Sequence, residues 1–188
     1  LSNKYNPLFN SDARYFIITG GRGSGKSFAV TVFLTLLTMT KGIRILFTRY
    51  TMTSAHLSII PEFLEKIGLL GFDEVFSINK AEVVNTSNQS DILFRGIRTS
   101  AGNQTASLKS LQGISTWVLD EAEELVDENI FDTIDLSIRE KNIHNRVVLI
   151  LNPVTKEHWI YKRFFEDKGV EGGFNGFKDN VCYIHTSY

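Results

Sequence analysis

The stretch GGRGSGKS, at residues 20–27, constrains the fold of this chain more than any other. It follows an apolar run at residues 15–19 and precedes a long apolar segment from Phe28 to Met39. A packed core does not account for this composition, because glycine raises the entropic cost of ordering and lone cations are poor core residues. The stretch fits the Walker A pattern G-x-x-x-x-G-K-[ST], in which backbone N–H groups surround phosphate oxygens at the start of a helix.

This loop supplies most of the expected nucleotide-binding residues. Lys26 is expected to reach the β- and γ-phosphates of ATP, and the Ser27 hydroxyl to bind Mg²⁺. The phosphates are expected to contact the whole loop: Gly20, Gly21, Arg22, Gly23, Ser24, Gly25, Lys26 and Ser27. The alternative interpretation is a flexible surface loop without a ligand.

A second candidate site element is the apolar run 116–119 that ends in Asp120 and Glu121. This is a Walker B pattern, in which Asp120 would hold the magnesium shell and Glu121 would deprotonate the attacking water. The alternative is an acidic first turn of a helix, which the helix dipole favours. Glu123 and Glu124 are better explained by that alternative.

Apolar runs alternate with helix-like stretches along the chain, a pattern typical of βαβ units and a mainly parallel sheet. We expect an α/β P-loop NTPase of the additional-strand, catalytic-glutamate (RecA-like) type, in which helices flank the sheet. Strands are expected at 15–19, 43–48, 116–120, 147–151 and 181–186, and helices at 25–40, 54–67, 129–139 and 156–166. The early Pro61 is expected to shift the start of the second helix. Short strands at 74–78, 82–85 and 91–95 predict an antiparallel extension, and residues 169–176 a mobile loop.

Composition excludes several classes of protein. With 188 residues, 43% of them hydrophobic, the chain is expected to form one domain over residues 1–188. No apolar run approaches the roughly 20 residues that cross a membrane. The single cysteine permits no internal disulfide, which favours a reducing cytoplasm. We expect structural roles for Cys182 and for the histidines at 56, 144, 158 and 185.

The net charge of −1 gives no overall positive field for binding nucleic acid. Any DNA contact therefore requires a local patch or an assembled ring. The candidate cations are Lys41, Arg44, Arg95, Arg98, Lys141, Arg146, Lys156, Lys162 and Arg163, and most of them are expected to be ordinary solvated charges.

Several motifs together resemble the ATPase domain of the large terminase subunit of tailed bacteriophages. A small GTPase fits poorly, since no Asn-Lys-x-Asp stretch is present to read guanine. The resemblance covers residues 14–165 and rests on GGRGSGKS, Arg49-Tyr50-Thr51, the stretch LKSLQGIS at 108–115, the stretch WVLDEAEE at 117–124, Leu151-Asn152-Pro153 and His158-Trp159-Ile160.

The resemblance implies roles for three further residues, each with a plainer alternative. Arg22 matches an arginine that acts on the phosphates within one subunit; alternatively it neutralises nearby carboxylates. Asn152 matches the coupling motif that senses the γ-phosphate, or it serves as a cap or turn residue before Pro153. Lys109 matches a basic residue that reaches the nucleotide of a neighbouring subunit, or it is a solvated lysine. Adenine could stack near Tyr5, Pro7, Phe9 and Arg14, although packing is expected for most of these.

The family resemblance also implies a motor that drives double-stranded viral DNA into the procapsid. Its implied partners are the portal protein and the small terminase subunit, in a homo-oligomeric ring without a membrane. The implied location is the cytoplasm of the infected bacterial host, transiently on the procapsid. The family's nuclease domain has no counterpart within these residues. Two alternatives stay open: a helicase-type or DNA-repair translocase lobe, and an assembly module that binds ATP without hydrolysing it.

Overall fold

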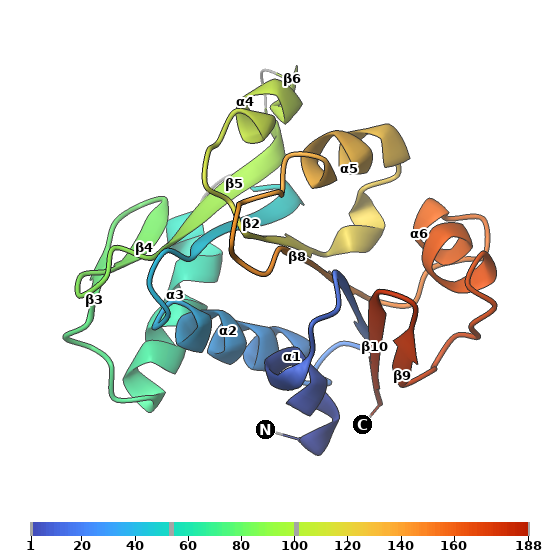
Figure 1. Cartoon of the computed structure of the whole chain (residues 1–188), viewed down its shortest axis with the longest axis horizontal. Helices are drawn as coiled ribbons and strands as arrows, with labels where there is room; N and C mark the ends of the chain where they lie inside the picture. Colours follow the sequence, from blue (N-terminus) through green and yellow to red (C-terminus); the bar gives the residue numbers. More distant parts are fainter. Residues whose placement is uncertain (1, 53–54, 100–101, 188) are drawn as a thin grey trace.

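The computed structural model describes residues 2–52, 55–99 and 102–187, and it is built around one β-sheet (Figure 1). In chain order the strands are β1 (Tyr15–Gly20), β2 (Arg44–Thr51), β3 (Phe76–Ile78), β4 (Glu82–Asn85), β5 (Asp91–Thr99), β6 (Gly102–Asn103), β7 (Thr116–Asp120), β8 (Arg146–Leu151), β9 (Gly176–Lys178) and β10 (Val181–Thr186). The α-helices are α1 (Asn6–Asn10), α2 (Lys26–Leu37), α3 (Ala55–Leu69), α4 (Thr105–Lys109), α5 (Glu128–Asp135) and α6 (Trp159–Tyr161). Two 3₁₀ turns, η1 (Asn3–Tyr5) and η2 (Ala122–Glu124), and a π-helical turn, η3 (Lys162–Glu166), complete the described elements.

The strand order is β3-β4-β5-β2-β7-β8-β1-β10-β9, with β6 paired to β5. The strands from β5 to β10 in this order are parallel to their neighbours, whereas β3, β4, β6 and β9 add antiparallel pairs. Strand β8 lies between β1 and β7, so one additional strand separates the Walker A strand from the Walker B strand. This arrangement confirms the α/β fold expected from the sequence, with its mainly parallel sheet and antiparallel extension.

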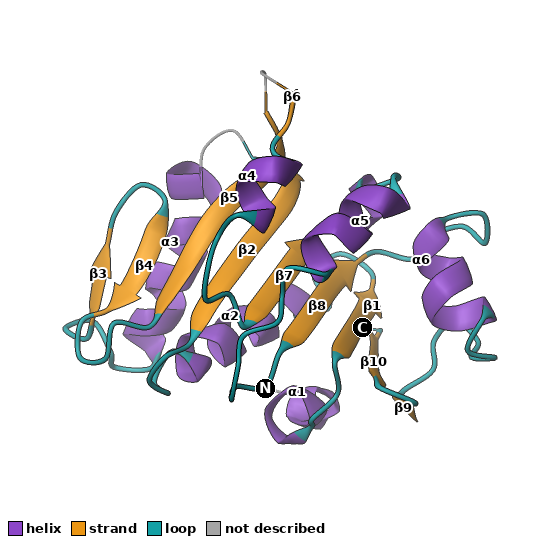
Figure 2. Ribbon diagram, turned by 45° about the horizontal axis from the view of Figure 1, so that its top comes forward, coloured by secondary structure: helices purple, strands orange, loops and turns teal. Residues whose placement is uncertain are grey.

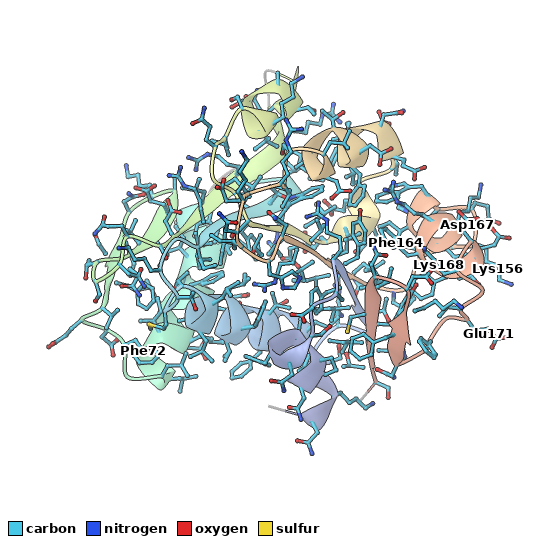
Figure 3. All side chains as sticks on the ribbon, in the orientation of Figure 1. Phe72, Lys156, Phe164, Asp167, Lys168 and Glu171 are labelled. Atoms are coloured by element: carbon cyan, nitrogen blue, oxygen red, sulfur yellow. The ribbon has the colours of Figure 1, made fainter. Side chains whose placement is uncertain are left out.

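Helices cover both faces of the sheet, with α2 and α3 on one face and α4 and α5 on the other (Figure 2). Because side chains alternate along a strand, a strand covered on both sides must be apolar at every position. In β1, Phe16 and Ile18 pack toward α2, while Ile17 packs into the opposite core. On that second side Phe164, labelled in Figure 3, contacts the ring of Phe131.

Strand β5 is longer than expected and has a different pairing. The sequence predicted a short antiparallel strand at 91–95, but β5 runs from Asp91 to Thr99 and pairs in parallel with β2 as well as antiparallel with β4. Gly96, which reads as a strand breaker, lies inside it. A Cβ on Gly96 would lie 3.1 Å from the backbone nitrogen of Met52, so the glycine allows two chain segments to approach closely.

Two helices differ from the prediction near Pro61 and near His158. Pro61 lies inside α3, which begins at Ala55, so the proline does not shift the start of this helix as expected. The helix expected at 156–166 begins only at Trp159 and continues as the π-helical turn η3. The side chain of His158 accepts a hydrogen bond from the backbone N–H of Ile160 and thereby caps this helix at its start.

Side chains from distant segments end two other helices early. Helix α2 ends at Leu37 instead of residue 40, and the carbonyl of Thr38 accepts hydrogen bonds from the side-chain amides of Asn85 and Asn88. Helix α5 ends at Asp135 instead of residue 139, and Arg14 donates to the carbonyls of residues 135 and 138. Both sets of contacts join residues far apart in sequence, which local patterns do not reveal.

The loop expected at 169–176 is confirmed as irregular up to Gly176, where β9 begins. The sequence did not predict η1, α1, β6, α4 or β9. Among the described residues no helix combines the length and apolar character needed to cross a membrane.

Candidate active site

The Walker A loop leaves β1 at Gly20 and enters α2 at Lys26, as predicted. Gly23 and Gly25 have φ angles of 74° and 82°, a region that favours glycine, and Gly25 is the N-cap of α2. A Cβ on Gly20 would lie 2.3 Å from the carbonyl oxygen of Thr186. These glycines are therefore needed for the loop's own shape, whatever the loop binds.

A pocket of about 510 Å³ opens at the carboxyl ends of the central strands. Its described lining residues are Arg22, Gly23, Ser24, Gly25, Lys26, Ser27, Phe28, Arg49, Glu62, Glu65, Lys66, Asp120, Glu121, Glu123, Glu124, Ile150, Leu151 and Asn152. The pocket thus brings together three motifs that were predicted from separate parts of the chain: the Walker A loop, the Asp-Glu pair and Asn152.

Lys26 lies at the base of this pocket and is 9% exposed. Its ammonium donates to the carbonyls of Gly20 at 2.5 Å and Gly21 at 2.8 Å. Burial lowers the pKa of Lys26, and the negative charges of Glu123 and Asp120 oppose that shift. The cation therefore lies between the loop backbone and the acidic side of the pocket.

Asp120 ends β7 and is 4% exposed, so its carboxylate needs a partner. Arg49, beside it on β2, donates to Asp120 Oδ2 from Nε at 2.8 Å and lies 2.7 Å from it through Nη2. The same guanidinium is 3.8 Å from Glu121 Oε2. Arg49 is therefore a site residue that the sequence reasoning noted only as part of a motif. In the sequence, Arg49 directly follows the strand expected at 43–48, but its pairing with Asp120 becomes visible only in the structure.

Glu121 follows β7 with a φ of 53°, an uncommon backbone region for a residue with a side chain. This turn directs its side chain, 46% exposed, to the pocket. Burial is the main cause that raises the pKa of Glu121, and the positive charge of Arg49 opposes it. The negative charges of Asp120, Glu124 and Glu123 raise the pKa further. A carboxyl group with a raised pKa at a pocket wall suits proton transfer near neutral pH.

The structure joins Glu123 to Asn152, a contact that the sequence does not predict. The Asn152 amide donates to Glu123 Oε1 at 2.5 Å, and the Asn152 backbone N–H donates to Oε2 at 3.2 Å. Glu123 was assigned to an acidic helix turn, but only the short turn η2 forms there. His158 strengthens the same junction, because its Nε2 lies 3.1 Å from the carbonyl oxygen of Glu123.

Helix α3 supplies a wall of the pocket that the sequence did not predict. Glu62, Glu65 and Lys66 project from it, and the Lys66 ammonium lies 2.9 Å from Glu65 and 4.9 Å from the ring centroid of Phe28. Burial raises the pKa of Glu62, whereas the charge of Arg49 lowers it. The sequence could not predict this wall, because the packing of α3 on α2 places these side chains at the pocket.

The other predicted residues divide between the pocket and the surface. Arg22 and Ser27 line the pocket, whereas Lys109 is exposed at the end of α4 and is not among the described lining residues. Tyr5 is 3% exposed, and the Phe9 ring packs edge-on against Phe33 at 5.3 Å. Arg14 bonds to residues 135 and 138 at the end of α5, so the packing expected for these three residues is confirmed.

Three of the nine candidate cations contact other side chains of the chain. Arg44 pairs with Asp91 at 3.0 Å, Arg163 contacts Asp132 at 2.6 Å, and Arg146 donates to His144. His158 and His185 also make hydrogen bonds, and the side chain of His56 lies outside the described residues. Cys182 is buried, which raises its pKa to about 12. Among the described residues no cluster of three or more His, Cys, Asp and Glu could hold a metal.

Several solved structures similar to this fold are large terminases or DNA packaging ATPases of bacteriophages. The large terminase of a thermophilic bacteriophage aligns over 98% of this chain and 45% of its own length, with a TM-score of 0.72 and 13% identity. It has also been solved with ATP-γ-S and with ADP. The ATPase domain of the Thermus phage P74-26 large terminase covers 100% of this chain and 80% of its own, with a TM-score of 0.68 and 19% identity. The N-terminal domain of the bacteriophage phi29 DNA packaging ATPase covers 98% and 96%, with a TM-score of 0.67 and 18% identity.

The chain spans less than half the length of the large terminase from the thermophilic bacteriophage. No curated protein sequence matches it. The family model described as the phage terminase large subunit, however, matches residues 12–188. That range includes the Walker A loop, the Asp-Glu pair and Asn152, and so this chain belongs to the phage terminase large subunit family.

Proposed function

We propose that this chain binds ATP in the 510 Å³ pocket and hydrolyses it to ADP and phosphate. One observation carries the proposal: the pocket places the phosphate-binding loop opposite Asp120 and Glu121. The loop N–H groups and Lys26 bind the phosphates, and Glu121 takes a proton from the water that attacks the γ-phosphate. Arg49 holds Asp120 and Glu121 in position for this step.

The site suits Mg²⁺ by the chemistry of its donors. Ser27 offers a hydroxyl and Asp120 a carboxylate at the same pocket, and Mg²⁺ binds such oxygen ligands together with phosphate oxygens and waters. When bound, the ion neutralises the charge that develops on the phosphates. The contact of Arg49 with Asp120 Oδ2 would hold this carboxylate in place for the ion.

Three further roles belong to this proposal. Arg22, on the pocket wall, contacts the phosphates within one subunit, and Asn152 senses the γ-phosphate through its contact with Glu123. Lys109, exposed on α4, reaches the nucleotide of a neighbouring subunit in a ring.

Family membership supports a motor function for this hydrolysis. We propose that ATP turnover drives double-stranded DNA into a procapsid, in the cytoplasm of the infected host, with the portal protein and the small terminase subunit as partners. The relative from phi29 is described as a DNA packaging ATPase, and its aligned domain covers nearly the same extent as this chain.

The test is ATP turnover by the purified chain and by two variants. Glu121→Gln is expected to abolish turnover while ATP still binds, because the amide cannot accept the proton. Lys26→Ala is expected to weaken ATP binding, because the phosphates lose a buried cation. A module that only binds ATP would show no turnover in the unmodified chain, and that result would refute hydrolysis.

A second measurement separates the motor from the helicase-type alternative. A packaging motor should hydrolyse ATP faster when procapsids bearing the portal protein are added with double-stranded DNA. Stimulation by DNA alone, with no response to procapsids, would favour a helicase-type or repair translocase lobe.

A further inference from the structure

Three hydroxyl groups meet at the Walker A loop, and two of them belong to residues that are not among the described residues lining the pocket. They belong to Tyr5 on η1, Ser24 in the loop and Thr186 at the end of β10. The Tyr5 phenol donates to the Ser24 carbonyl at 3.1 Å and lies 3.5 Å from Thr186 Oγ1. Thr186 Oγ1 is 3.0 Å from Ser24 Oγ and 3.3 Å from the carbonyl oxygen of Thr19.

Tyr5 and Thr186 are both 3% exposed, so water does not replace these contacts when they are lost. Burial raises the pKa of Tyr5, which keeps the phenol protonated and able to donate. Neither residue is among the described residues that line the pocket, so any effect on a nucleotide must pass through the loop residues that they contact, of which Ser24 makes the hydrogen bonds.

Ser24 connects Tyr5 and Thr186 to the rest of the loop through its own hydrogen bonds. Its hydroxyl donates to the Gly21 carbonyl at 2.8 Å, and the Lys26 ammonium lies 3.5 Å from the same hydroxyl. The next residue is Gly25, the N-cap of α2, and a Cβ there would lie 3.9 Å from the Tyr5 phenol oxygen. Tyr5 and Thr186 therefore restrain both the hydroxyl and the carbonyl of the residue at the bend of the loop.

We propose that Tyr5 and Thr186 are positioning residues for nucleotide binding, which hold the Walker A loop in its phosphate-binding shape. The inference rests on the proposed function of the pocket. A loop that is already formed does not spend binding free energy on being ordered, so its apparent affinity is higher. Loss of either hydroxyl leaves the pocket residues unchanged but lowers the population of the binding-competent loop.

The experiment compares Tyr5→Phe and Thr186→Val with the unmodified chain. Calorimetric titration with ADP and Mg²⁺ gives the dissociation constant, and steady-state ATP turnover gives KM and kcat. Each variant is expected to raise the ADP dissociation constant and the KM for ATP about fivefold, the size expected for one hydrogen bond. kcat is expected to stay within about twofold, since Lys26 and Glu121 remain in place.

Two controls separate positioning from general stability. Tyr15→Phe also removes a phenol contact, here a part-buried one on a different part of the chain, because the Tyr15 hydroxyl donates to Asp135 at 2.7 Å. Tyr15→Phe should not alter ADP affinity even where it lowers the melting temperature. Thr186→Ser keeps the hydroxyl and should restore the affinity that Thr186→Val loses. The double variant of Tyr5 and Thr186 should lose less than the product of the two single effects, because both restrain Ser24.

The proposal is overturned if Tyr5→Phe and Thr186→Val bind ADP as tightly as Tyr15→Phe does. It is also overturned if they lower kcat and leave the affinity for ADP unchanged. These results differ from a failure of the proposed function. If the unmodified chain binds ADP but does not hydrolyse ATP, hydrolysis is wrong while the affinity comparison still decides the roles of Tyr5 and Thr186. If it does not bind ADP at all, both proposals are wrong.

Discussion

Glu123 receives two hydrogen bonds from Asn152, from the side-chain amide and from the backbone N–H. The contact joins the segment after β7, which carries the proposed base, to the segment after β8, which carries the proposed γ-phosphate sensor. Both segments line the same pocket. If Asn152 moved on loss of phosphate, it would therefore also displace Glu123, which lies two residues after Glu121.

Glu123→Gln is expected to lower kcat about tenfold, because hydrogen bonds to a charged group contribute about 1.5–3 kcal/mol and glutamine offers only one acceptor oxygen. ADP binding should not weaken, because the variant removes a negative charge from the pocket and leaves Lys26 and the rest of the loop in place to bind the phosphates. Steady-state kinetics and ADP titration measure both quantities. Asn152→Ala should have a similar effect, with no further loss in the double variant. Glu124→Gln, at the neighbouring position, is the matched control; an equal loss of kcat there would contradict the assignment.

Arg49 is predicted to set the pH at which Glu121 becomes active. Burial raises the pKa of Glu121 above its ordinary value of 4.5, and the charge of Arg49 opposes this. A general base must be deprotonated, so activity is lost as the pH falls through the pKa of Glu121. Arg49→Met should shift this acid limb of the kcat profile to higher pH and lower kcat at the optimum, because Asp120 also loses its partner.

The Arg49 prediction has two control variants. Arg49→Lys keeps the charge but loses the two-nitrogen contact with Asp120, so the acid limb should return toward its original position while kcat stays low. Lys168→Met removes a cation that pairs with Asp179 on the surface and should not move the limb. An acid limb that moves to lower pH in Arg49→Met would refute the electrostatic role.

Two adjacent glycines of the loop are predicted to differ sharply in tolerance. A Cβ on Gly20 would lie 2.3 Å from the Thr186 carbonyl oxygen, whereas a Cβ on Gly21 would meet nothing within 4 Å. Gly20→Ala should lower the free energy of unfolding by about 1–3 kcal/mol, the usual cost of overpacking, and should impair ADP binding. Gly21→Ala should change the unfolding free energy little. Denaturant unfolding of both variants gives the comparison, and similar losses would show that the crowding at Gly20 is unimportant.

The sequence was sufficient to predict the elements that local patterns control. The Walker A glycines are conformationally constrained, and the mainly apolar strands β1, β7 and β8 are expected to be buried on both faces. The carboxyl ends of parallel strands meet at one edge, and Lys26, Asp120 and Asn152, which were expected to serve one site, line the same pocket. The additional-strand type of fold was expected from the sequence, and the structure identifies the additional strand as β8, between β1 and β7.

What the sequence did not reveal depends on contacts between distant segments. The pairing of Arg49 with Asp120 follows from the register of β2 against β7. The contact between Glu123 and Asn152 requires the chain to turn after both strands. Tyr5 reaches the loop from residues that show no regular periodicity.

His144 is predicted to make stability depend on pH. Burial lowers its pKa, and the positive charge of Arg146 lowers it further, while the Ala13 carbonyl and Asp12 oppose the shift. The imidazole Nε2 donates to the Ala13 carbonyl at 2.9 Å, and Nδ1 accepts from Arg146 at 2.6 Å. Protonation would place an N–H on Nδ1 facing the arginine, so the folded protein favours the neutral ring.

The sign of the effect follows from this lowered pKa. The contribution of His144 to the free energy of unfolding is fully present above its ordinary pKa of 6.5 and is lost as the pH falls through the lower pKa of the folded state. Urea unfolding at several pH values from about 7.5 to about 5 should therefore show the stability gap between the unmodified chain and His144→Gln shrinking at low pH. Arg146→Met should reduce the pH dependence by removing the charge that lowers the pKa. A gap that is constant across this range would show that His144 does not titrate with unfolding.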